Sequence, residues 1–318
     1  MLGNHFLTLS DLQAQDLTEL IQLARYLKAR RTKGVIEDVL RGKTLAMIFE
    51  KPSLRTRVSF ECAMQELGGA SLYLSHEEVG IGKRETADDV ARVLGRYVHG
   101  IMARTFKHQT VCDLAQYAGV PVINGLSDLE HPCQALADFL TIQEHLGSLK
   151  DRTIVFIGDG NNVARSLAHC AILAQARLIL ASPAAYAFTK DDQRAFGAHW
   201  GTAVSQTTDI RAAAKGADVL YTDVWTSMGQ EAERAQRLKD FQGYQINSEL
   251  IALAGPQVRV MHCLPAHRGE EITGEAMECP ASIVFDQAEN RLHAQKAVLR
   301  LLMAKDRFEV LAAAKGKQ

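Results

Sequence analysis

Short apolar runs alternate with longer amphipathic segments along this chain of 318 residues, and this alternation constrains its fold more than any other feature. Buried strands are predicted at seven runs, residues 44–49, 100–103, 120–123, 153–157, 178–180, 218–221 and 258–261. Helical spacing follows in stretches such as 134–145 and 163–174. Such alternation is typical of βαβ units with parallel sheets. We therefore expect an α/β fold with two doubly wound parallel-sheet domains joined by helices.

A domain boundary is predicted near residues 147–151, where one helical segment ends and a fresh strand opens. This places a first domain at residues 1–147 and a second at 148–288. Residues 290–315 are rich in Ala, Leu, Lys and Arg, which predicts one long helix within the final segment, 289–318.

Composition narrows the classes of function. Lys and Arg number 36 against 37 Asp and Glu, so the net charge of −1 argues against a non-specific nucleic-acid binder. Residues 1–18 lack a signal-peptide pattern, and no apolar run approaches the roughly 20 residues of a membrane span. Six scattered cysteines show no zinc spacing, so we expect reduced thiols and no metal. Together these features lead us to expect no membrane partner and a cytoplasmic location.

The first candidate site lies where the run 44–49 gives way to a Pro-Ser turn and a helix. Backbone N–H groups at a helix start attract anions. Ser53 and Thr56 add hydroxyl groups, and Arg55 adds a guanidinium group suited to phosphate. The alternative is a Ser N-cap followed by solvated arginines.

Two further signals lie in the same half of the chain. Arg104 closes an apolar strand, where charges often face the ligand crevice of an α/β sheet. His131 and Gln134 are three residues apart across a helix start, so both side chains can face one pocket. A surface arginine and a His-Pro cap on a core helix are the alternatives.

The second half holds a loop, residues 158–163, that mimics a dinucleotide site. Val163 replaces the third glycine of that pattern, so a dinucleotide is disfavoured, and Asn161 and Asn162 offer polar groups instead. Asp223 ends a strand before a polar loop and could hold an ammonium group; a turn-capping Asp is the alternative.

A His-Cys pair ends the run 258–261. Neighbouring residues on a strand point to opposite faces, so His262 and Cys263 are not expected to form a catalytic dyad. A buried structural thiol is the alternative for Cys263. Arg291 lies near the start of the final helix and could reach a pocket or remain solvated.

In combination these motifs are far more specific. Ser-x-Arg-Thr-Arg at 53–57, Arg104 and His-Pro-x-Gln at 131–134 resemble the carbamoyl-phosphate domain of the transcarbamylase family. Gly-Asp-Gly-Asn-Asn, Asp-x-x-x-Ser-Met-Gly and His-Cys-Leu-Pro are similar to its ornithine branch. The resemblance covers nearly the whole chain. It implies ornithine carbamoyltransferase activity without a cofactor, with arginine biosynthesis favoured over breakdown, and a homotrimer.

The resemblance also implies roles for single residues. The carbamoyl-phosphate site would take Ser53, Leu54, Arg55, Thr56, Arg104, His131, Gln134, Cys263, Leu264 and Arg291. The ornithine site would take Asn162, Asp223, Ser227 and Met228, and the groups at the reacting atoms would be Cys263, Arg104 and His131. Residues 1–147 would bind carbamoyl phosphate, 148–288 would bind ornithine, and the helix in 289–318 would return to the first domain.

Two positions depart from the family pattern. Leu54 stands where the phosphate loop often has Thr, so only its main chain is expected to contribute. Gly80 stands where many members carry a Gln that reaches a neighbouring subunit, so Gly80 is left out of the site. Lys83 or Arg84 is the hypothetical replacement for that anion contact.

Three rival functions remain open at this stage. A nicotinamide oxidoreductase would use the glycines of 158–160, but Val163 opposes it. A non-catalytic relative should have lost the phosphate-binding residues, which are retained. A transcarbamylase acting on putrescine or N-acetylornithine is disfavoured by the Ser-Met-Gly loop.

Overall fold

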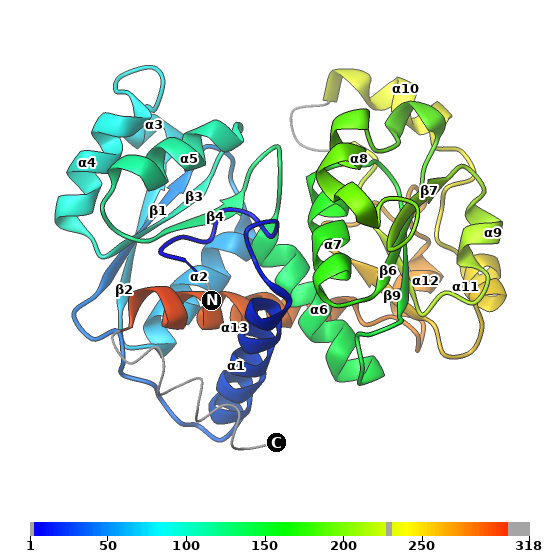
Figure 1. Ribbon diagram of the computed structural model, residues 1–318, viewed down its shortest axis with the longest axis horizontal. Coiled ribbons are helices and arrows are strands. Elements are labelled where there is room, and N and C mark those ends of the chain that lie inside the picture. Colours follow the sequence, from blue (N-terminus) through cyan, green and yellow to red (C-terminus); the bar gives the residue numbers. More distant parts are fainter. Residues whose placement is uncertain (1–2, 227–230, 305–318) are drawn as a thin grey trace. The chain divides into compact units, whose positions relative to one another are not determined.

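The computed structural model describes residues 3–226 and 231–304, and the chain divides into two compact units (Figure 1). Unit 1 comprises Met1–Leu140 with Glu289–Gln318, and unit 2 comprises Thr141–Ala288. Among the described residues, no helix has the length and apolar character that crossing a membrane requires. The boundaries predicted at residues 147 and 288 stay a prediction.

Unit 1 contains a four-stranded parallel sheet in the order β2-β1-β3-β4. Its elements are α1 (Ala14–Thr32), β1 (Thr44–Phe49), α2 (Leu54–Glu66), β2 (Ala70–Ser75), α3 (His76–Val79), α4 (Ala87–Tyr97), β3 (Gly100–Arg104), α5 (His108–Tyr117), β4 (Val122–Leu126) and the start of α6 (Pro132–Leu146). The chain winds outward from β1 to β2, then from β3 to β4 in the other direction. This reversal places a switch point between β1 and β3.

Unit 2 contains a five-stranded parallel sheet in the order β7-β6-β5-β8-β9, with its switch point between β5 and β8. Its elements are β5 (Thr153–Ile157), α7 (Asn162–Leu173), β6 (Arg177–Ala181), η1 (Ala184–Tyr186), α8 (Lys190–Phe196), η2 (Gly197–His199), β7 (Val204–Thr207), α9 (Ile210–Ala214), β8 (Val219–Thr222), η3 (Glu231–Glu233), α10 (Arg234–Asp240), α11 (Ser248–Ala254), β9 (Arg259–His262), α12 (Gly274–Glu278) and the start of α13 (Val284–Met303).

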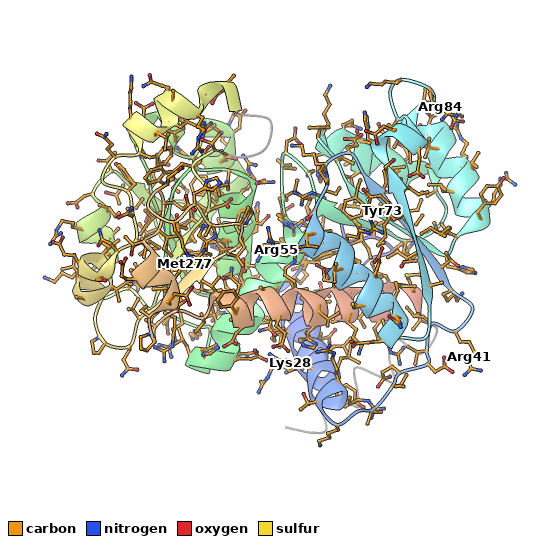
Figure 2. All side chains as sticks on the ribbon, turned by 180° about the vertical axis from the view of Figure 1, so that it is seen from behind. Lys28, Arg41, Arg55, Tyr73, Arg84 and Met277 are labelled. Atoms are coloured by element: carbon orange, nitrogen blue, oxygen red, sulfur yellow. The ribbon has the colours of Figure 1, made fainter. Side chains whose placement is uncertain are left out.

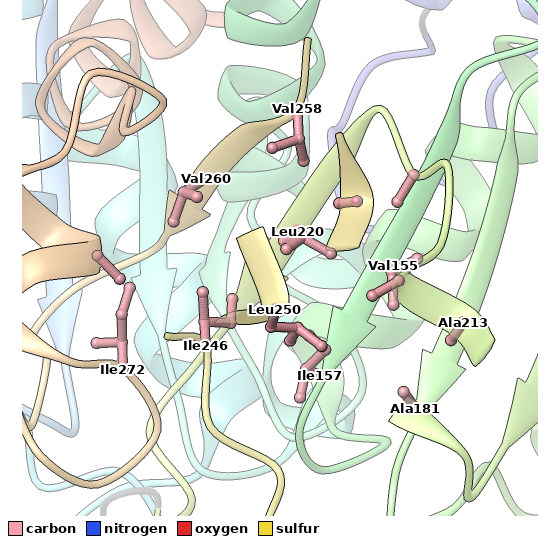
Figure 3. Packing of buried hydrophobic residues seen from close by; sticks show 14 of the residues in the cluster. Val155, Ile157, Ala181, Ala213, Leu220, Ile246, Leu250, Val258, Val260 and Ile272 are labelled. Atoms are coloured by element: carbon pink, nitrogen blue, oxygen red, sulfur yellow. The ribbon is translucent and has the colours of Figure 1, made fainter. Parts of the chain in front are cut away.

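Alternating side chains of the strands form the cores. In unit 1, Ala46 and Ile48 of β1 share a cluster with Val90 of α4 and Leu114 of α5. In unit 2, side chains from β5, β8 and β9 pack against α9, α11 and α12 (Figure 3). Packing on both faces requires continuous apolar strands, which explains why the sequence pattern detects them.

The expected α/β class with two parallel sheets is confirmed. The return of the final helix to the first unit is also confirmed, because Gln295 of α13 donates to Ser59 of α2 at 2.7 Å and Lys296 contacts Glu66 at 2.8 Å. This helix begins at Val284, six residues before the predicted start, and the predicted part beyond residue 304 lies outside the described residues.

Two strands, β2 and β7, are not among the predicted runs. Both lie at a sheet edge; β2 has no fully buried position, and β7 has one apolar residue, Val204, followed by polar residues. A search for continuous buried runs therefore passes over them.

Candidate active site

The register of unit 1 brings two predicted site segments to one sheet edge. Phe49 at the end of β1 pairs with Arg104 at the end of β3. The loop that follows β1 and the side chain that ends β3 therefore meet at the switch point, the usual ligand position in such sheets.

The start of α2 forms the predicted anion loop. The Ser53 hydroxyl oxygen accepts a hydrogen bond from the Thr56 N–H at 3.4 Å and lies 3.1 Å from the Thr56 hydroxyl oxygen. Arg55 is half-buried at this helix start (Figure 2). The Leu54 side chain is 75% exposed, so it packs against little.

Arg291 of α13 joins the anion loop to α6. Its guanidinium group donates to the Gln134 side-chain oxygen at 2.7 Å, to the Thr56 hydroxyl at 3.2 Å and to Gln295 at 3.0 Å. Gln134 in turn donates to Asp138 at 2.8 Å. All of these side chains are buried, so the network fixes Arg291 in one orientation.

His131 lies inside a cationic environment. Burial holds the pKa of its imidazole well below the ordinary 6.5, and the positive charges of Arg291, Arg104 and Arg55 lower this pKa further. Unit 1 thus places three guanidinium groups around an imidazole that is neutral at pH 7. A neutral imidazole can donate a hydrogen bond to an oxyanion, and the guanidinium groups can neutralise a phosphate dianion.

The register of unit 2 aligns three strand ends in the same manner. Ile157 of β5 pairs with Thr222 of β8, and Thr222 pairs with His262 of β9. The residues that follow, including Asp223 and Cys263, therefore lie together beside the switch point.

Asp223 is the centre of this second group. Its carboxylate accepts from the Asn161 side-chain amide at 3.2 Å, from the Cys263 thiol at 3.0 Å and from the Val224 N–H at 2.8 Å. Asn161 also caps α7 through the N–H groups of its first turn. Since a carboxylate only accepts, the sulfur atom donates as a thiol in this arrangement.

Arg237 supports the adjoining loops. It contacts Asp159 at 2.6 Å and donates to the Trp225 carbonyl at 3.1 Å, and its guanidinium carbon lies 4.8 Å from the centre of the Tyr186 ring. Burial raises the pKa of Asp159, and the neighbouring carboxylates of Asp223 and Glu233 raise it further, while Arg237 opposes the rise. Unit 2 is therefore rich in negative charge at its switch point.

Most predicted site residues fall into these two groups. The group in unit 1 contains Ser53, Arg55, Thr56, Arg104, His131, Gln134 and Arg291. The group in unit 2 contains Asp223 and Cys263, and Leu264 directly follows Cys263 in the chain. Asn162 is the first residue of α7, beside the contact that Asn161 makes. Ser227 and Met228 lie outside the described residues.

Sequence reasoning missed several residues of these groups. Asn161 was noted only as polar, although an Asn directly before a helix is a usual N-cap. No sequence motif marks Arg237, and its contacts arise only from the fold.

A cluster of possible cation ligands lies in the loop after β9. His267, Glu270 and Glu271 place ligand atoms within 4.8 Å of one another. Glu270 also forms an ion pair with Arg234, and Glu271 accepts a hydrogen bond from His262. The Arg234 ion pair neutralises part of the negative charge of this cluster, and the His262 hydrogen bond occupies one of its carboxylate oxygens. The sequence-based expectation of no metal stays a prediction.

Two family models match the two halves of the chain. The carbamoyl-P binding domain of aspartate/ornithine carbamoyltransferase matches residues 4–144, and the Asp/Orn binding domain matches residues 150–302. The matches cover both switch points described above.

Relatives and solved structures agree with these matches. An ornithine carbamoyltransferase of Archaeoglobus fulgidus is 53% identical over 302 residues, covering 95% of this chain and 98% of the relative. An anabolic ornithine carbamoyltransferase of Pyrococcus furiosus is 49% identical over 312 residues, covering 96% and 98%.

The crystallographic neighbours extend this agreement to the fold. The ornithine carbamoyltransferase structure from Pyrococcus furiosus has a TM-score of 0.90 at 49% identity, covering 94% of this chain and 96% of that one. The enzyme from Thermus thermophilus has a TM-score of 0.87 at 47% identity, covering 95% and 100%. The chain belongs to the aspartate/ornithine carbamoyltransferase family.

Proposed function

We propose that the chain transfers the carbamoyl group of carbamoyl phosphate to the δ-amine of L-ornithine, giving L-citrulline and phosphate. A C–N bond forms, the bond from the carbamoyl carbon to the phosphate oxygen breaks, and that oxygen leaves with the electron pair. The observation that carries this proposal is the cluster of Arg55, Arg104 and Arg291 around neutral His131 in the unit that matches a carbamoyl-P binding domain.

Unit 1 supplies the groups for carbamoyl phosphate. The N–H groups at the start of α2, with Ser53, the Leu54 main chain, Arg55 and Thr56, bind the phosphate. Arg104, His131 and Gln134 orient the carbamoyl group and stabilise its developing oxyanion. Gln134 is held by Arg291 and Asp138, which orients its amide before substrate arrives.

Unit 2 supplies the groups for ornithine. The negative charge of Asp223, with Asn162, Ser227 and Met228, holds the amino-acid end of the substrate. An alkylamine resembles Lys with a pKa of about 10.4, so a neutral δ-amine at pH 7 costs about 4–5 kcal/mol. Cys263 is the candidate proton acceptor: its thiol passes its own proton to the Asp223 carboxylate that it contacts, and the resulting thiolate takes the proton that the δ-amine must lose.

Leu264 contributes through its carbonyl oxygen. Its N–H already donates to His262 at 2.8 Å, so the carbonyl is the main-chain group that is open to a substrate N–H. The carbamoyl NH₂ group is a donor of this kind.

A citrulline assay with three acceptors tests the proposal. We expect product with ornithine and little with putrescine, which lacks a carboxylate, or with N-acetylornithine, which lacks the free α-ammonium group. Equal turnover with N-acetylornithine would contradict the assignment of Asp223 to the α-ammonium group. The anabolic relative from Pyrococcus furiosus favours arginine synthesis as the metabolic role.

We further propose a cytoplasmic homotrimer, as the family resemblance implies. Exposed apolar side chains support a subunit contact on unit 1: Leu54 and Val58 on α2, and Leu72 on β2. Sedimentation analysis should give three times the chain mass, and fractionation of the source cells should place the protein with cytoplasmic markers. A monomer at assay concentration would contradict the trimer.

Arg84 is the better candidate for the anion contact that Gly80 cannot make. Gly80 has a φ of +66°, and a Cβ atom there would meet the Arg84 side chain at 2.9 Å. The glycine thus gives room for Arg84, which projects from the turn after α3 (Figure 2). Substituting Lys83 and Arg84 together by Ala should weaken carbamoyl-phosphate binding, and unchanged affinity would remove this hypothesis.

A further inference from the structure

One carboxylate oxygen ties together both ends of the loop that carries Cys263 and Leu264. Glu271 Oε1 accepts a hydrogen bond from His262 Nε2 at 3.0 Å and from the His267 N–H at 2.6 Å. Glu271 is fully buried, and His262 is 1% exposed. Hydrogen bonds to a carboxylate in a buried place are strong, so this contact restrains the intervening loop.

The second nitrogen of the same imidazole fixes the main chain of Leu264. The Leu264 N–H donates to His262 Nδ1 at 2.8 Å, and Leu264 adopts a φ of +58°. A non-glycine residue in the left-handed region costs about 1–2 kcal/mol and persists only where its surroundings hold it. The imidazole is a direct restraint on this conformation.

The hydrogen-bond partners allow only one state of the ring. The Leu264 N–H can only donate, so Nδ1 accepts, and the Glu271 carboxylate can only accept, so Nε2 carries the proton. The main chain of His262 is held as well, because its N–H donates to Gln287, which donates to the Tyr221 hydroxyl at 3.0 Å. The main chain that carries the imidazole ring is therefore held in place.

We infer that His262 and Glu271 are positioning residues for the transfer reaction, which aim the Leu264 carbonyl and hold Cys263 beside Asp223. The inference rests on the proposed function and adds two buried residues to its machinery. Neither residue need touch substrate, since Leu264 and Cys263 follow directly in the chain and Cys263 contacts Asp223 at 3.0 Å. A misplacement of about 1 Å at such a site can cost about 10²-fold in rate.

Paired variants separate positioning from folding. Glu271→Gln keeps an oxygen acceptor for both donors, whereas Glu271→Leu removes it. We expect Glu271→Leu to lower kcat for citrulline by about 10²-fold, with Glu271→Gln retaining most of the activity. The Kd for carbamoyl phosphate alone should rise far less than kcat falls in both variants, because the phosphate contacts are assigned to unit 1 and only the Leu264 contact is disturbed. Wild-type kcat in Glu271→Leu would overturn the inference, as would equal loss in both folded variants.

His262→Asn provides an independent arm. Its side-chain oxygen can still accept from the Leu264 N–H, so it should retain more kcat than His262→Leu; equal activities would contradict the restraint on Leu264. The control is His293→Asn, another buried histidine with a glutamate partner, Glu289 at 3.1 Å, but in unit 1. It should leave kcat unchanged within about twofold.

Nitrogen-15 NMR of labelled histidine gives a readout that needs no turnover. The signals that vanish in His262→Asn should show a protonated Nε2 and a bare Nδ1, and the opposite tautomer or an imidazolium would overturn the inference. A wild-type protein that makes no citrulline would refute the proposed function, while these spectra would still decide the state of His262.

Discussion

The two sheets follow the same winding rule but carry opposite charges at their switch points. In unit 1 the edge between β1 and β3 collects Arg55, Arg104 and Arg291. In unit 2 the edge beside β5 and β8 collects Asp159 and Asp223. The fold thus determines where a ligand can bind, and the side chains at the strand ends determine which charge that ligand carries.

The pKa shifts express the same contrast. Burial and three guanidinium groups lower the pKa of His131, whereas burial and nearby carboxylates raise that of Asp159. In each unit burial is the main cause that favours the neutral form, and nearby charges of one sign act in the same direction, although Arg237 opposes the rise at Asp159. An anion bound in unit 1 would offset its positive charge, and a cation bound in unit 2 would offset its negative charge. These are the charges of the two substrate groups proposed for the two units.

The largest expected effect belongs to the thiol of unit 2. Cys263→Ala should reduce turnover by about 10²-fold or more if the thiol transfers a proton, and should shift the pH profile of kcat. Cys279→Ala is the matched control, since this half-buried thiol of the same unit donates to the main-chain oxygen of Ala276 in α12 at 3.2 Å. A wild-type pH profile in Cys263→Ala would refute the proton-transfer role.

The next effect tests whether the phosphate belongs to unit 1. Arg55→Gln should raise the Kd of carbamoyl phosphate by about 10–100-fold, because a hydrogen bond to a charged group contributes about 1.5–3 kcal/mol. Calorimetry with carbamoyl phosphate alone measures it. Arg57→Gln, an exposed arginine one half-turn on that pairs with Glu61, is the control and should bind normally.

The same titration, applied to a variant of unit 2, tests whether that unit also binds the phosphate. Asp223→Asn in unit 2 should leave the Kd of carbamoyl phosphate unchanged while weakening ornithine. A comparable loss of carbamoyl phosphate in Asp223→Asn would break the division of charge between the units.

A smaller effect concerns acid stability. The pKa of His131 is lowered on folding, so its contribution to stability is present above the unfolded value of 6.5 and is lost as pH falls toward the folded value. Below pH 6.5 the unfolded chain binds a proton that the folded chain resists. Urea unfolding between pH 8 and pH 5 should therefore show a shallower acid loss in His131→Gln than in the wild type. An equally steep loss would contradict the neutral state of His131.

The smallest effect is expected at the departure from the family loop. Leu54→Thr restores a hydroxyl at an exposed position, where water competes for the same hydrogen bond, so we expect a gain of only about 0.5–1.5 kcal/mol. Carbamoyl phosphate should bind at most about tenfold more tightly, by the same calorimetry. A weaker complex would indicate that the leucine side chain itself contributes.

The predictable parts of the molecule are those whose signal is local. The bounds of β1 and β5 match the predicted runs, because buried strands are continuous apolar segments. The anion loop follows from the chemistry of a helix start. Arg291 was placed only by family resemblance, because its contact with Thr56 spans 235 residues of sequence.

Other contacts have no local signal at all. Arg237 reaches Asp159 across 78 residues, and the pairing of His262 with Glu271 depends on how the loop after β9 folds back. Edge strands such as β2 are similarly hidden, since one of their faces is not fully buried.

The hydrogen bonds at the start of α2 show where the phosphate loop can change. Ser53 and Thr56 contact each other at the start of the helix, and the Thr56 hydroxyl also accepts from Arg291. A substitution at either position would have to preserve both the start of α2 and the proposed contact with phosphate. Leu54 lies between them with its side chain 75% exposed, so it takes part in neither the helix start nor the Arg291 contact and is open to the proposed subunit contact. The phosphate loop can therefore change at position 54 without loss of the contacts that begin the helix or of the contact with Arg291.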